Sequence, residues 1–190
     1  MAARVKLVRR PGDHPDAAER DAEAELFETL FAGKADPQID DNHLALAALA
    51  QNPRLALKAS QLSGFLLLET AWGRRAAVRE LAMQVVNRRL GCDYGAATRV
   101  GPAKAAGLSE VQLAAIADWR ASDLFDDEQR LVIEYAETAV AGPIPDEIFS
   151  RLVAHYGEQE AVECTAVIGL WSFWATIANA TRPEAAASSA

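Results

Sequence analysis

A glutamate and a cysteine in one stretch of the chain have the types and spacing to do chemistry together. Glu80 lies in an apolar, helix-like segment, and Cys92 follows twelve positions later, after a turn signal at Gly91. A carboxylate in a partly apolar cleft can act as a general base, and a thiol at a helix start is favoured as a thiolate. Glu80 is therefore a candidate base and Cys92 a candidate nucleophile. The plainer alternatives are a solvated carboxylate and a thiol that only fills space.

Two residues that follow Cys92 could complete such a site. Arg99 carries a planar guanidinium, which suits two-pronged binding of a carboxylate, and Tyr94 has a hydroxyl that could donate to the same pocket. An exposed arginine and a core aromatic residue are the competing interpretations. We take Glu80, Cys92, Tyr94 and Arg99 as the candidate catalytic residues.

No cofactor or metal site is indicated. The chain has no glycine-rich phosphate loop, nucleophile elbow or pair of neighbouring cysteines. Its three histidines, His14, His43 and His155, are scattered without ligand spacing. The expected partner is a small-molecule substrate, for which a carboxylate is a candidate.

The elements that must position these residues are helices. Ala, Leu, Glu and Arg dominate, and apolar residues recur at intervals of three and four rather than two, which predicts an all-α fold. Glycines, prolines and capping residues, including the capping-box pattern at Ser109, divide the chain. We expect helices over residues 16–32, 43–51, 54–70, 74–90, 93–106, 109–119, from 126 or 127 to about 140, 146–156 and 159–179.

Length and composition favour one helical domain over residues 16–181, with a flexible N-terminus at 1–15 and a disordered tail at 182–190. The last helix is apolar nearly all round, with Trp171 and Trp174 along it, so it should be buried centrally or at a contact between subunits. A homo-oligomer is therefore expected.

The charge balance limits the partners. The chain has 27 acidic and 19 basic residues, a net charge of -8, and no long basic run, which disfavours nucleic acid. The N-terminus lacks the uninterrupted apolar core of a secretory signal, and the most apolar stretch, residues 164–180, contains several polar residues. With only two cysteines, in separate segments, the sequence predicts a cytoplasmic protein in a reducing compartment that does not enter the membrane.

The chain resembles the carboxymuconolactone decarboxylase family, which includes the AhpD-like alkylhydroperoxidases. The likeness lies in Ala48–Pro53, Arg79–Ala82, Gly91–Tyr94, Ala105–Glu110, Gly157–Glu160, Val162–Glu163 and Ala166–Gly169, and covers roughly residues 42–181. It implies a single AhpD-like helical domain with an N-terminal helical extension, and a homo-oligomer. It also implies that Glu80 and Cys92 line a pocket.

The same resemblance shows what is missing. The peroxidase branch combines the glutamate with two cysteines three positions apart and a histidine four positions after the second cysteine. In this chain the position of the second cysteine is Gly95, and the position of the histidine is Arg99. Such peroxidation needs one cysteine to attack the peroxide and a second to resolve the sulfenic acid. The resemblance therefore argues against a CxxC alkylhydroperoxidase.

Three functions stay open on the sequence. The first is a lyase-like or decarboxylase-like enzyme that acts on a small organic acid or lactone without the two-cysteine cycle. The second is a one-cysteine, peroxiredoxin-like antioxidant protein resolved by an external thiol. The third is a non-catalytic binding or assembly protein that keeps the scaffold.

Overall fold

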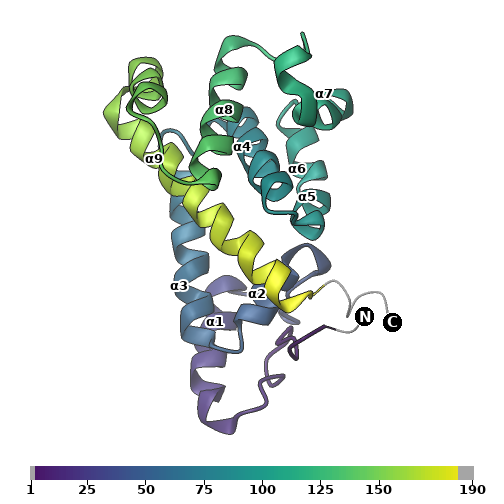
Figure 1. Cartoon of the computed structure of the whole chain (residues 1–190). Helices are drawn as coiled ribbons and strands as arrows, with labels where there is room; N and C mark the ends of the chain where they lie inside the picture. Colours follow the sequence, from purple (N-terminus) through teal and green to yellow (C-terminus); the bar gives the residue numbers. More distant parts are fainter. Residues whose placement is uncertain (1–2, 184–190) are drawn as a thin grey trace. The chain divides into compact units, whose positions relative to one another are not determined.

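The computed structural model of the chain describes residues 3–183, and all regular structure within that range is helical (Figure 1). This confirms the predicted all-α fold. The longer helices are α1 (Arg20–Leu30), α3 (Pro53–Gly64), α4 (Ala76–Arg89), α8 (Asp127–Ala141) and α9 (Asp146–Thr181), and the short ones are α2 (Leu44–Leu49), α5 (Asp93–Thr98), α6 (Val100–Ala105) and α7 (Glu110–Ala115). A π-helical turn, Phe65–Glu69, follows α3, and a 3-10 turn, Ile116–Ala121, follows α7.

The chain forms two compact units. The first comprises residues 3–63 and 176–183, and the second comprises residues 64–175. The predicted helical domain at 16–181 is thus built from two units. The expected tail at 182–190 lies almost wholly outside the described residues.

The first unit holds the N-terminal segment, which the sequence predicted to be flexible. Val8 is fully buried, and its backbone N–H donates to the carbonyl oxygen of Ala47 at 2.9 Å. The backbone N–H of Ile39 donates to the carbonyl oxygen of Arg9 at 2.9 Å. The backbone N–H of Arg4 likewise donates to the carbonyl of Thr181. Residues 3–15 are therefore fastened along the unit by backbone hydrogen bonds on both sides of the chain.

The second unit is built around α4. This helix packs most extensively against α8 and also contacts α5 and α6. Its apolar side chains Leu81, Val85 and Val86 are 1% exposed or less. Because apolar residues occur on nearly every side of α4, the helix is surrounded by the rest of the unit.

Two helix starts follow the predicted capping chemistry. The Ser109 hydroxyl accepts from the Gln112 N–H at 3.1 Å, and the Gln112 side chain accepts from the Ser109 N–H in return. Asp126 and Gln129 form the same reciprocal pair at the start of α8. Each box satisfies backbone donors that a helix start leaves unpaired.

The predicted helix at 93–106 is wrong in one respect, because it is two short helices. Arg99 ends α5 and precedes α6. Pro102 has no N–H to donate back toward Thr98, so the hydrogen-bond ladder is interrupted at this point. Arg99 therefore lies between two helices and not inside one.

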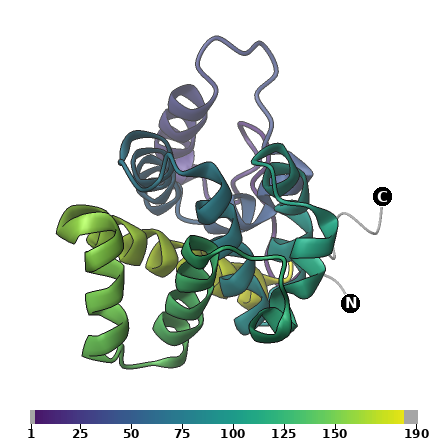
Figure 2. The same cartoon turned by 90° about the horizontal axis from the view of Figure 1, so that it is seen from above.

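Helix α9 bends at Gly157, whose φ of 81° lies in the left-handed region. Figure 2 shows two straight segments that meet at this corner of α9. The two predicted helices, 146–156 and 159–179, correspond to these segments. In the second, Val167, Ile168 and Leu170 are buried, while Val162 is exposed.

Length and composition alone would let α9 cross a membrane, a test that core helices of soluble proteins also pass. The predicted subunit contact through its second segment stays a prediction.

Candidate functional site

Three polar residues on α4 form a buried stripe in the second unit. Glu80, Gln84 and Asn87 are 1%, 3% and 1% exposed and follow one another at intervals of four and three residues. That spacing places them on one face of a helix. Burying polar groups is costly unless they are hydrogen-bonded, so their partners define what this face does.

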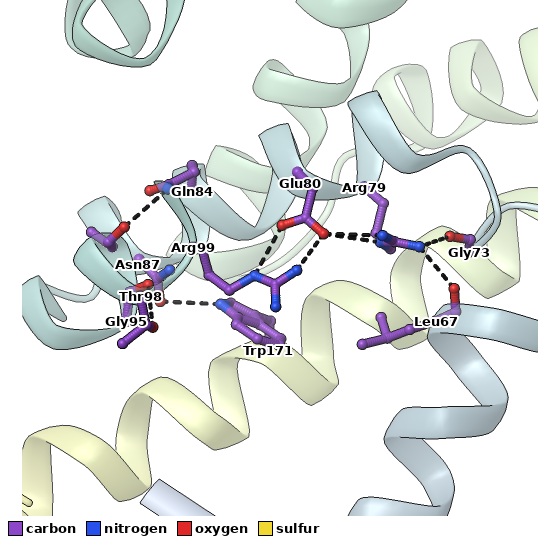
Figure 3. A network of polar contacts seen from close by, with 11 residues as sticks. Leu67, Gly73, Arg79, Glu80, Gln84, Asn87, Gly95, Thr98, Arg99 and Trp171 are labelled. Atoms are coloured by element: carbon purple, nitrogen blue, oxygen red, sulfur yellow. Dashed lines mark hydrogen bonds and ion pairs between the residues drawn. The ribbon is translucent and has the colours of Figure 1, made fainter. Parts of the chain in front are cut away.

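The carboxylate of Glu80 is held by Arg99. The guanidinium donates from Nε to Glu80 Oε2 at 2.9 Å and from Nη2 to Oε1 (Figure 3). This is the two-pronged geometry in which arginine binds a carboxylate most strongly. The sequence predicted a carboxylate partner for Arg99, and in this structure that partner is Glu80 itself.

Arg79 approaches Glu80 from the other side. Its Nη2 lies 3.0 Å from Glu80 Oε1, and its Nη1 donates to the carbonyls of Leu67 and Gly73 at 2.8 and 2.6 Å. A Cβ on Gly73 would overlap the carbonyl oxygen of Leu66, so only glycine permits this turn. Two guanidinium groups thus share the one carboxylate of Glu80. The two positive charges and one negative charge leave this cluster with one surplus positive charge, in a protein of net charge -8.

Trp171 of α9 lies against this cluster. The Arg99 Cζ atom is 5.2 Å from the centre of the Trp171 ring, a cation–π distance. The indole Nε1 of Trp171 donates to Asn87 Oδ1 at 3.1 Å. Trp171 therefore links the arginine to the far end of the polar stripe (Figure 3).

The remaining stripe contacts fasten the segment that carries Cys92. Gln84 Nε2 donates to the carbonyl of Ala96 at 3.0 Å, and the N–H of Cys92 donates to the backbone carbonyl of Asn87 at 2.8 Å. Neither Gln84 nor Asn87 was among the residues that the sequence analysis identified as site candidates. The signal was present, because polar residues at helical spacing inside an apolar helix must find buried partners.

Cys92 is the N-cap of α5. Its Sγ accepts from the N–H of Gly95 at 3.4 Å, and the residue is 1% exposed. A Cβ built on Gly95 would lie 3.0 Å from both Cys92 Sγ and Asn87 Cγ, and closer still to Asn87 Oδ1. Gly95 therefore leaves the space that the Asn87 amide occupies.

The structure brings together three of the four candidate residues. Glu80 and Arg99 are in direct contact, and Cys92 is joined to the same stripe through Asn87. Tyr94 is half-buried in the first turn of α5. Whether any of the four is catalytic stays a prediction.

The second cysteine is buried elsewhere in α9. Burial raises the pKa of the Cys164 thiol far above its ordinary value, which keeps it protonated. Within residues 3–183 the two cysteines do not form a disulfide. Nor does that range contain a group of three His, Cys, Asp or Glu side chains placed to hold a metal ion.

Comparison with known sequences gives a partial match. No protein-family model matches the chain. An uncharacterized Escherichia coli K12 protein, YnjA, is 47% identical over 75 residues, which are 38% of this chain and 41% of YnjA. The matched stretch therefore spans less than half of that relative.

Solved structures match the fold more fully. One is ATU0492 of Agrobacterium tumefaciens, a protein of unknown function proposed to be the antioxidant defence protein AhpD. It matches with a TM-score of 0.61 and 24% identity, over 70% of this chain and 92% of its own. The debrominase Bmp8, solved as a cysteine-to-alanine variant with 2,3,4-tribromopyrrole, matches with a TM-score of 0.66 and 15% identity, over 98% of both chains.

These matches confirm the predicted fold class. The chain is AhpD-like in fold and all helical within residues 3–183, and its candidate site is the Glu80–Arg99 ion pair, with Cys92 joined to the same polar stripe through Asn87. Fold alone does not carry an activity from one protein to another, so function must be argued from the site.

Proposed function

We propose that this AhpD-like protein acts on a small organic carboxylate or lactone and does not use a two-cysteine peroxide cycle. The observation that carries the proposal is the surplus positive charge of the Glu80 cluster. Arg99 donates hydrogen bonds from Nε and Nη2 to the carboxylate of Glu80. Its third nitrogen, Nη1, makes no hydrogen bond to another residue within 3–183. The Arg99 side chain is 19% exposed, and in the proposal an anion binds at this nitrogen.

In this proposal Glu80 positions Arg99 rather than acting as a base. Both carboxylate oxygens already accept hydrogen bonds from guanidinium groups. A carboxylate engaged in this way cannot take a proton from a substrate without giving up an ion pair. Its role is to fix the plane of the Arg99 guanidinium over Trp171 and to aim Nη1 at the ligand.

The exclusion of a two-cysteine cycle rests on Gly95 and Cys164. Gly95 supplies no thiol next to Cys92, and burial keeps the Cys164 thiol protonated, since its pKa is raised. A resolving cysteine must attack the sulfenic acid as a thiolate. Both observations support chemistry that does not need a second cysteine.

Direct binding measurements test the proposal. We expect succinate, benzoate or γ-butyrolactone to bind in isothermal titration calorimetry, and R99M to weaken binding at least about tenfold, a loss of about 1.4 kcal/mol. The matched control is R151M, which removes an exposed arginine paired with Glu134. Equal binding by the R99M and wild-type proteins, or binding of none of the probes, would overturn the assignment.

A second candidate function is single-thiol chemistry at Cys92. It is favoured by the Gly95 N–H that donates to Cys92 Sγ, and by the fold likeness to a debrominase studied as a cysteine variant. The sulfur would attack a hydroperoxide, breaking the O–O bond to give an alcohol and a sulfenic acid. One external thiol then forms a mixed disulfide with release of water, and a second restores the Cys92 thiol and leaves as a disulfide.

Peroxide consumption with dithiothreitol as the external thiol separates the two candidates. Turnover that is lost in C92S and kept in C164S would support single-thiol chemistry. Because Cys92 is 1% exposed, we expect any such turnover to be slow and limited by local opening. Equal consumption by C92S and wild type would remove this candidate.

A further inference from the structure

We propose that Asn87 is a further ligand-binding residue of this site, whose Nδ2 donates to an oxygen of the bound carboxylate or lactone. The inference rests on the proposed function and deepens it, because it names a second recognition group besides Arg99. It starts from a buried donor that the protein does not satisfy. Within residues 3–183, the Nδ2 atom of Asn87 has no hydrogen-bond partner although the residue is only 1% exposed.

The orientation of the Asn87 amide is fixed by Trp171. An indole N–H can only donate a hydrogen bond, so the amide atom that faces Trp171 Nε1 must be the oxygen. The two N–H bonds of Nδ2 consequently point away from the indole. Exchanging the amide nitrogen and oxygen would set two donors against each other and leave the indole unsatisfied as well.

A buried donor without an acceptor calls for an explanation. Roughly 90% or more of buried polar groups in native structures have a partner. The stripe neighbours of Asn87 follow that rule, because Glu80 is bound by two arginines and Gln84 by the Ala96 carbonyl. Asn87 is therefore the one member of the stripe whose side-chain donor is left over.

The surroundings of Asn87 fit a small acceptor-rich molecule. Asn87 contacts the indole nitrogen of Trp171, and Arg99 lies at a cation–π distance from the same ring, so the unpartnered Asn87 amide and the Arg99 guanidinium both lie next to one aromatic side chain (Figure 3). A carboxylate or a lactone offers two oxygens that accept hydrogen bonds. Such a ligand can pair with Arg99 Nη1 and Asn87 Nδ2 together, whereas a cation would be repelled by the surplus positive charge.

The test changes the donor while keeping the shape. N87D preserves an acceptor for Trp171 but replaces the Nδ2 donor by oxygen, and we expect it to weaken the binding of benzoate and succinate at least about tenfold. Q84E is the matched control. It makes the same amide-to-acid change on the same helix, at a residue whose amide already has a partner, and should weaken binding less than N87D.

A second measurement needs no variant. In the wild-type protein, the side-chain amide protons of Asn87 should shift in a ¹H–¹⁵N spectrum when benzoate is added, and this shift should disappear in R99M. If R99M weakens binding while N87D and the Asn87 resonances do not respond, the inference about Asn87 fails and the proposed function stands. If neither R99M nor N87D weakens binding, the proposed function fails with it. The inference would also be overturned if the Asn87 side-chain amide protons contact a bound water and their signals do not shift when benzoate is added.

Discussion

Arg99 binds both carboxylate oxygens of Glu80, although the two residues are nineteen positions apart in the chain. The pair joins α4 to the junction of α5 and α6. A charged contact between side chains from distant parts of the chain therefore lies inside the second unit.

Removing the Glu80 charge should destabilise the protein strongly. E80Q leaves two partly buried guanidiniums without a counter-charge, and breaking a buried ion pair costs about 3–5 kcal/mol. Since Arg79 and Arg99 are 15% and 19% exposed, we expect a loss near the lower end, about 3 kcal/mol. Urea unfolding followed by circular dichroism measures this loss. E134Q, which breaks the more exposed pair with Arg151, should leave the unfolding midpoint nearly unchanged.

Restoring a cysteine at Gly95 should not restore a working thiol pair. The new Cβ would overlap Asn87 Oδ1, and overpacking of this kind costs about 1–3 kcal/mol. We therefore expect G95C to lower the melting temperature and to form little disulfide with Cys92, as measured by thiol titration after mild oxidation.

The double variant N87A/G95C provides the complementary result, because the shortened side chain removes the overlap. It should form more disulfide than G95C alone. G101A is the steric control, since a Cβ at that helical glycine meets no atom within 4 Å and alanine there should be neutral or stabilising. A G95C protein as stable as wild type would contradict the steric argument.

The first unit should lose stability as the pH rises above neutrality. The carbonyl of Gln51, which lies 3.2 Å from His14 Nε2, raises the pKa of His14, with further contributions from Asp16 and Glu23 against an opposing effect of burial. A histidine whose pKa is higher in the folded state stabilises that state below its unfolded value of about 6.5, and this contribution disappears as the pH passes the folded value.

Urea unfolding at about pH 6 and about pH 8 tests this dependence. The wild-type protein should be more stable at the lower pH, and H14Q should flatten the difference. H155Q, which changes a histidine that remains in contact with solvent, should keep the difference. If the difference in unfolding free energy between the two pH values is larger in H14Q than in wild type, the predicted direction of the His14 effect is wrong.

The two cysteines should differ in reactivity. Burial raises the pKa of Cys164, so its thiol should resist iodoacetamide in the folded protein even at about pH 8.5, where an ordinary thiol is half ionised. Cys92, which accepts a hydrogen bond from the Gly95 N–H, should be alkylated faster. Mass spectrometry of C92S and C164S separates the two rates, and both should be modified after unfolding.

Most of the fold could be predicted from local sequence signals. Capping residues such as Ser109 and Asp126, and stops such as Gly157, act within a few residues of themselves, so they can be found without knowing the tertiary structure. The interruption at Arg99 was not predicted, although Pro102, which has no N–H to donate toward Thr98, is the local signal that indicates it. The π-helical turn Phe65–Glu69 was missed because it depends on contacts with residues further along the chain.

The candidate site was predictable only in part. Glu80, Cys92 and Arg99 stand out by type and spacing, but the pairing of Arg99 with Glu80 is a tertiary contact that spacing does not reveal. For the helix that carries Trp171, central burial and a subunit contact both stayed open, because the sequence cannot show which side of an apolar helix meets α4. The proposed role of Asn87 depends on its contact with Trp171 and on the burial of its Nδ2 atom. Both are properties of the folded chain and cannot be found in the sequence.

The glycine at position 95 also bears on how this protein could change over evolutionary time. Because the Asn87 amide occupies the room beside Cys92, a mutation to cysteine at Gly95 is harmful unless Asn87 has already become smaller. The order of mutations then decides the outcome, because the same cysteine is disfavoured before a change at Asn87 and accepted after it. The packing around Gly95 therefore makes a second thiol beside Cys92 a two-step change for this chain, in which position 87 must change first.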